Sequence, residues 1–99
     1  MTATPIVFRK EMGVTHVEIH RLMPRVAQGV EFHFADGCFT LPLTQGRVEI
    51  HISPQGERRL SAIAVFPLVH VEIHCHAMND AQAHDFVRHF DKQFFRAGG

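Results

Sequence analysis

This sequence has no tryptophan, no tyrosine and no excess of charge of either sign. Ten Lys and Arg residues balance ten Asp and Glu residues. Proteins that bind nucleic acid or anionic membranes through general electrostatics need a basic excess, so the composition argues against both classes. We therefore expect neither nucleic acid nor a membrane among its partners.

Long apolar runs are also missing. The longest uncharged, mostly apolar run covers residues 61–69, whereas a membrane-spanning helix needs about 20 such residues. The first residues lack the basic and then apolar pattern of a secretory signal, which predicts a cytoplasmic protein. Cys38 and Cys75 are too far apart for a CxxC pair, so we expect two free thiols and assign Cys75 to the core.

The motifs of several enzyme classes are absent as well. There is no P-loop and no dinucleotide-binding glycine pattern. The two serines, Ser53 and Ser61, do not lie in a nucleophile-elbow motif. The sequence motifs therefore point to no catalytic residue and to no organic cofactor. It leaves enzymatic activity undecided and favours a non-enzymatic role.

What is present predicts one domain over residues 1–99, because 45% of the residues are hydrophobic and no linker interrupts them. A first helix is predicted over residues 16–27, where Thr15 and Glu18 have the spacing of a capping box. Pro24 predicts a kink or an early end to this helix, and Gly29 is a candidate for its C-cap.

Alternating apolar and polar residues predict strands over 30–34, 38–43, 48–52, 58–66 and 68–78. Pro67 is either a bend or a turn, so the strand count is four or five. The last strand has the clearest alternation. It should place one set of side chains in the core and the other on a polar face, the core set being Val69, Val71, Ile73 and Cys75.

A second helix is predicted over residues 80–96, capped by Asn79 or Asp80. These elements predict an α+β fold, a two-layer sandwich. It has an N-terminal helix, an antiparallel meander of four to five strands, and a C-terminal helix packed on one sheet face. The covered face is expected to carry Phe32, Phe34, Phe39, Leu41, Val48, Ile50, Ile52, Val71 and Ile73.

Nine histidines are the most unusual feature. Several share the polar face of the sheet, where Glu31 and Glu49 also lie. Imidazole and carboxylate groups together suit Zn, Ni or Cu. The candidate ligands for a divalent transition metal are His70, His74, His76, His51 and Glu72. Two other interpretations stay open: a solvated sheet face, and a self-association surface that buries these histidines.

The residues alone therefore favour a small non-enzymatic interaction module that forms a homodimer or binds a protein partner. A metal-binding protein that uses the strand histidines is the alternative. A small enzyme or ligand-binding protein with a phenylalanine-lined site between sheet and helices is the second alternative.

Overall fold

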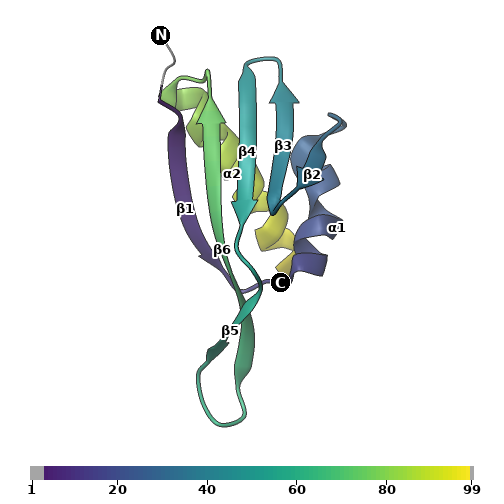
Figure 1. Ribbon diagram of the computed structural model, residues 1–99, viewed down its shortest axis with the longest axis vertical. Coiled ribbons are helices and arrows are strands. Elements are labelled where there is room, and N and C mark those ends of the chain that lie inside the picture. The colour runs from purple at the N-terminus through teal and green to yellow at the C-terminus, as the bar shows by residue number, and fades with distance from the viewer. Residues whose placement is uncertain (1–3, 99) are drawn as a thin grey trace.

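The computed structural model describes residues 4–98, which form two helices and six strands. The helices are α1 (His16–Ala27) and α2 (Asp80–Gly98). The strands are β1 (Ile6–Met12), β2 (His33–Ala35), β3 (Cys38–Leu43), β4 (Gly46–Ile52), β5 (Gly56–Arg59) and β6 (Val65–His76). All described strand pairs are antiparallel, in the order β1-β6-β4-β3-β2, and β5 pairs with the first part of β6 (Figure 1).

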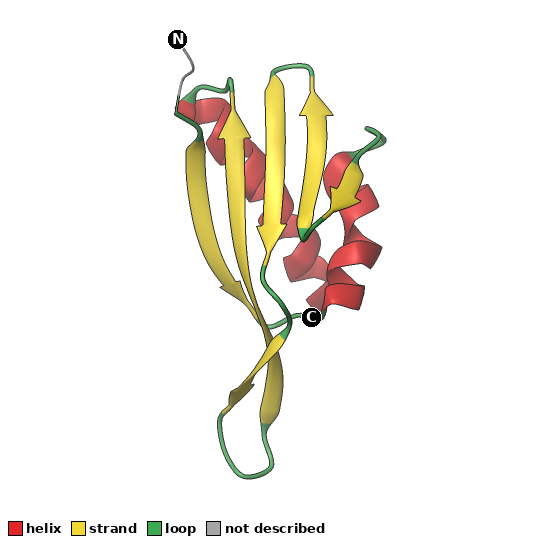
Figure 2. Ribbon diagram, in the orientation of Figure 1, coloured by secondary structure: helices red, strands yellow, loops and turns green. Residues whose placement is uncertain are grey.

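Both helices cover one face of the sheet, which confirms the α+β class (Figure 2). Alternate side chains of β3, β4 and β6 point toward the helices and are buried, as the alternation predicts. Phe39 from the sheet and Phe90 from α2 are among the largest fully buried side chains. Neither helix of the described chain is long and apolar enough to span a bilayer.

The start of α1 follows from the predicted capping box. Thr15 Oγ1 accepts a hydrogen bond from the Glu18 N–H (3.1 Å), and Glu18 Oε1 accepts one from the Thr15 N–H (3.2 Å). Two backbone donors that a helix start leaves unpaired are thus satisfied. The Thr15 side chain provides one of the two hydrogen bonds of the capping box.

Thr15→Ala should therefore lower the free energy of unfolding by about 1 kcal/mol, the usual cost of removing a helix cap. Urea denaturation of the purified variants measures it. Thr44→Ala is the matched control, because that hydroxyl lies in an exposed turn and bonds only to Gln45. The control should change stability by less than about 0.5 kcal/mol. Equal losses in the two variants would contradict the capping role.

Pro24 does not end α1 early, and the helix has the predicted bounds 16–27. The helix continues to Ala27 because the loss of one backbone donor in the last turn is offset by the burial of Met23 and Val26. The left-handed C-cap is Gln28 (φ 52°), and Gly29, the expected cap, follows it with φ 87°. Gln28 donates its N–H to the Pro24 carbonyl at 3.1 Å.

β1 was not expected, since the predicted chain began with a helix. The run Arg9-Lys10-Glu11 hides the alternation of the half-buried Ile6, Phe8 and Met12. Lys10 lies in register with these apolar residues, and its ammonium reaches Asp91 of α2 at 3.0 Å. β1 pairs with β6 along its whole length. The histidine-bearing strand is therefore an interior strand with neighbours on both sides.

The expected strand over residues 58–66, interrupted at Pro67, was also wrong. β5 ends at Arg59, and β6 passes through Pro67, which pairs with Glu57. Proline is tolerated there because this ribbon has only two strands, so each has an open side. Residues 56–68 thus form a hairpin that projects beyond the sheet (Figure 1), which we call the arm.

A bulge separates the arm from the sheet. Ile52 pairs with Val71 and Gly56 with Leu68, so residues 53–55 face only residues 69–70. Ser53 holds this irregular stretch: its N–H donates to the His70 carbonyl and its Oγ accepts from the His70 N–H, both at 2.9 Å. An extra residue on one strand bends the ribbon and increases its twist. The arm therefore leaves the plane of the sheet.

The strand expected over residues 30–34 is displaced toward the C-terminus and shortened to β2. As a result Phe34, expected in the core, is exposed, and its ring packs against His20 with the centroids 4.5 Å apart. Phe32 is half-buried against the core. The short length of β2 is typical of a strand at the edge of a sheet.

Candidate functional site

The polar face of β4 and β6 gathers the histidines that the sequence singled out. Because the two strands are antiparallel, Glu49 lies opposite His74 and His51 lies opposite Glu72, while Arg47 lies opposite His76. Directly opposed side chains on one face are within contact distance. The strand pairing therefore concentrates imidazoles and carboxylates at the centre of the sheet.

Three of these side chains converge. His76 Nε2 lies 2.9 Å from Glu49 Oε1, and the rings of His74 and His76 are stacked with centroids 6.4 Å apart. One ligand atom each from Glu49, His74 and His76 lies within 4.8 Å of the others. We call these three residues the Glu49 cluster. His51 borders it, with its Nε2 3.6 Å from Glu49 Oε1.

The carboxylates of this face are held in their ionised form. The hydrogen bond from His76 is the main reason that the pKa of Glu49 lies below its usual value. The hydrogen bond from His74 does the same for the pKa of Glu72, with a smaller contribution from the charge of Arg9. Donors that bind the anionic form stabilise it. Both groups are therefore carboxylates at neutral pH and can accept hydrogen bonds or bind a cation.

The structure unites only part of the predicted ligand set. It brings His74 and His76 together, places His51 beside them, and leaves Glu72 to bind His74 at 3.0 Å. His70 lies apart, 3.9 Å from Glu11 of β1.

Glu49 was missing from the predicted set. Its place on the polar face was evident from the alternation of residues 48–52, but the register against β6 was not.

Three of the histidines on the helices have structural partners. His16 Nε2 lies 2.7 Å from the Ser53 carbonyl oxygen, and His20 packs on Phe34 and Phe39. His89 of α2 lies 3.2 Å from the carbonyl oxygens of Arg25 and Val26, at the end of α1. These contacts explain the positions of all three without a ligand.

Both cysteines are free thiols. Cys75 is buried in the core, as expected, and burial raises its pKa. Cys38 lies on the polar face with its Sγ 3.7 Å from His51 Nε2, and burial again raises the pKa of the thiol. A reactive cysteine needs a lowered pKa, so neither thiol has the character of an activated nucleophile.

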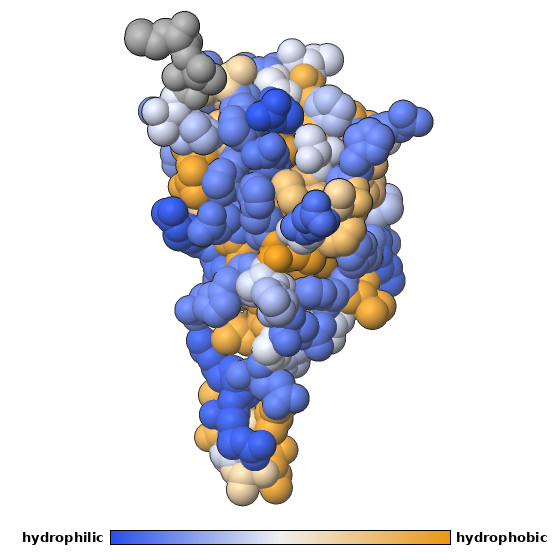
Figure 3. All heavy atoms as spheres, viewed as in Figure 1, coloured by the Kyte–Doolittle hydropathy of each residue, from blue (hydrophilic) through white to orange (hydrophobic). Residues whose placement is uncertain are grey.

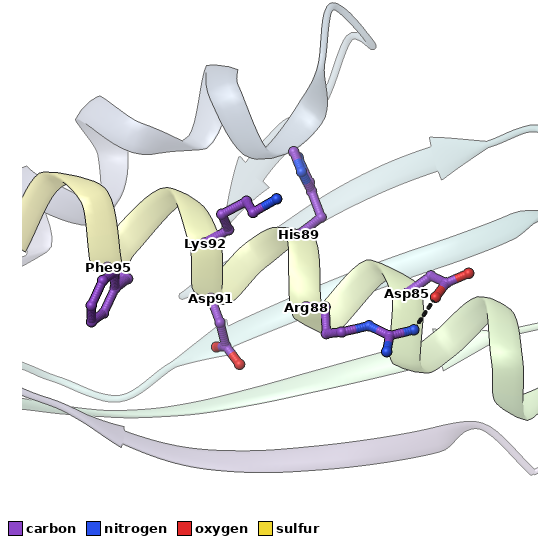
Figure 4. Close-up of a pocket in the computed structure, with 6 residues that line it drawn as sticks. All are labelled: Asp85, Arg88, His89, Asp91, Lys92 and Phe95. Atoms are coloured by element: carbon purple, nitrogen blue, oxygen red, sulfur yellow. Dashed lines mark hydrogen bonds and ion pairs between the residues drawn. The ribbon is translucent and has the colours of Figure 1, made fainter.

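The interior offers no support for a phenylalanine-lined ligand site within residues 4–98. Phe39 and Phe90 fill the space between the layers instead of lining a cavity. A surface hollow of about 660 Å³ runs along α2, and Phe95 is the one phenylalanine among the residues that line it (Figure 4). Its charged side chains include Asp85 and Arg88, which pair with each other.

The arm carries most of the large hydrophobic side chains that are exposed in the described chain. Among the described residues, four of the seven exposed large hydrophobic side chains belong to it: Leu60, Ile63, Val65 and Phe66. Figure 3 shows hydrophobic side chains along both sides of the arm, whereas the sheet face above it is mostly hydrophilic. At the base of the arm, Leu60, Phe66 and Leu68 line a hollow of about 330 Å³.

Comparisons of the chain with models of protein families, with curated proteins and with solved structures found no match.

Proposed function

We propose that this protein is a small interaction module that associates with a second copy of itself through the arm. The observation that carries the proposal is the exposure of the arm's apolar side chains, with Ile63 96% exposed at the tip. Contiguous apolar surface of this kind marks interaction sites on proteins. The role is one of binding and needs no catalytic residue.

The construction of the arm supports a partner. Over residues 56–59 and 65–68 it is a two-stranded ribbon whose strands pair only with each other in the described chain. Such a ribbon is at best marginally stable in water, because it has no second layer to bury its apolar side chains. Packing against another molecule supplies that layer.

The arm's chemistry favours a second copy over an unrelated protein. Glu57 and Arg59 are two residues apart in β5, so their opposite charges lie on the same face of the strand. A two-fold axis that crosses the arms at Arg58 would make them antiparallel and place Glu57 of one copy opposite Arg59 of the other. The exposed Ile63 is an apolar projection, and the hollow offers Leu60, Phe66 and Leu68 beside the ion pair of Arg58 and Glu11. A balanced formal charge adds no net repulsion between copies.

Light scattering coupled to size-exclusion chromatography tests the proposal over a range of concentrations. The wild type should approach about twice the chain mass of 11.2 kDa as concentration rises, and Ile63→Asp should stay monomeric. Val17→Asp is the matched control, because Val17 is also an exposed apolar residue (76%) but lies on α1. The control should dimerise like the wild type. A wild type that stays monomeric, or a control that loses the dimer equally, would contradict the proposal.

A further inference from the structure

We propose that the Glu49 cluster is a binding site for a divalent transition metal of the zinc type. It lies near the opposite end of β6 from the arm, so the site is independent of self-association. Two imidazoles and one carboxylate are a common ligand set for zinc. These borderline ligands suit Zn²⁺ and Co²⁺ better than Ca²⁺ or Mg²⁺, which prefer oxygen alone.

The geometry of the cluster is close to that of a bound site. Ligand atoms around a tetrahedral zinc ion are about 3.3 Å apart, given bonds of about 2.0–2.2 Å. The three ligand atoms already lie within 4.8 Å of one another. The pairing of β4 and β6 already holds the three Cα atoms in place. Small side-chain rotations are therefore enough to bring the ligand atoms from 4.8 Å to the spacing of a bound ion. The ion would replace the proton shared by His76 and Glu49.

The surroundings provide the support that a metal-binding imidazole requires. Glu72 hydrogen-bonds His74 at 3.0 Å and is itself held by Arg9 at 3.2 Å. An imidazole fixed by a carboxylate through one ring nitrogen can bind a metal through the other, and such partners raise metal affinity. This chain of contacts orients His74 before any metal arrives.

Access to the cluster is also adequate. The side chains of Glu49, His74 and His76 are 24–26% exposed, so water can leave and an ion can enter without unfolding. Arg47 lies 3.7 Å from Glu49 and must yield to an ion, which its 53% exposed side chain permits. Three protein ligands leave a fourth position for water, with His51 at its border.

Titration of the metal-free protein with ZnCl₂, followed by calorimetry, tests the site. The Ile63→Asp background keeps the protein monomeric if the arm proposal holds, and the wild-type chain is titrated in parallel. We expect one Zn²⁺ per chain in both. His76→Gln should weaken binding at least tenfold, and the double variant with His74→Gln should abolish it. CoCl₂ should give the intense visible absorption of a tetrahedral site.

His70→Gln is the matched control, because His70 lies on the same face of the same strand but contacts Glu11 instead of the cluster. It should bind Zn²⁺ like the parent. Glu49→Gln is a second variant that leaves every histidine in place and should also weaken binding. Far-UV circular dichroism confirms that each variant is folded. No zinc binding, a stoichiometry other than one, or an equal loss in His70→Gln would overturn the proposal.

Discussion

Replacing Phe90 with alanine should lower the free energy of unfolding by about 3–5 kcal/mol. The ring of Phe90 is 1% exposed and packs on Phe94 with the centroids 4.7 Å apart. The substitution removes the ring from the centre of the core and leaves a cavity that the neighbours fill only in part. Because a domain of this size has a net stability of about 5–10 kcal/mol, the loss takes away a large part of it.

Urea denaturation measures the effect against a control on the same helix. Phe95→Ala removes an equal ring that is 81% exposed, so its cost should stay within about 0.5 kcal/mol. Phe90→Leu keeps most of the buried volume and remains measurable if the alanine variant is too unstable to purify. A Phe90→Ala cost no larger than that of Thr15→Ala would show that the core has been misassigned.

Gly46→Ala should cost about 3 kcal/mol, the upper end of the usual cost of overpacking. A Cβ atom at Gly46 would lie 2.3 Å from the His76 carbonyl oxygen and 3.0 Å from that of Ala77. These are backbone atoms, so relief requires the end of β6 to move away from β4. The close approach of the two strands explains why β4 begins with glycine.

Gly13→Ala is the control, since the nearest atom to a Cβ there is the Pro67 carbonyl oxygen at 3.7 Å, an ordinary contact. Thermal denaturation of both variants should show a clear drop in melting temperature for Gly46→Ala and little change for Gly13→Ala. A Gly46→Ala variant as stable as the wild type would mean that β4 and β6 do not approach so closely.

The features that could be predicted from the sequence depend on local pattern. The capping box placed the start of α1 at the correct residue, and strict alternation placed Val71, Ile73 and Cys75 of β6 in the core. Both signals arise within a few neighbouring residues. Side-chain direction in a regular element follows from periodicity alone.

The features that were missed depend on contacts between distant segments. β1 was hidden because Lys10 occupies a core-facing position and is compensated by Asp91, more than 80 residues later in the chain. The arm was mistaken for a longer strand because residues 60–66 are mostly apolar, as in a core strand, although their large side chains are exposed to solvent. In each case the tertiary environment, not the local composition, decides the structure.

The candidate site shows the same division. Alternation alone could place His74 and His76 on one face, but the choice of Glu49 over His70 as their companion depends on the register between β4 and β6. A shift of register by two residues would keep every side chain on its face and change every neighbour.

Hydrogen exchange of the arm tests its role as the dimer interface most directly. If a second copy covers the arm, amide hydrogens of residues 56–68 should exchange at least tenfold more slowly in concentrated wild type than in Ile63→Asp. Amides of residues 71–76 should exchange alike in both, because β1 and β4 flank that part of β6 in each. Equal exchange of the arm in the two proteins at high concentration would contradict an arm-mediated dimer.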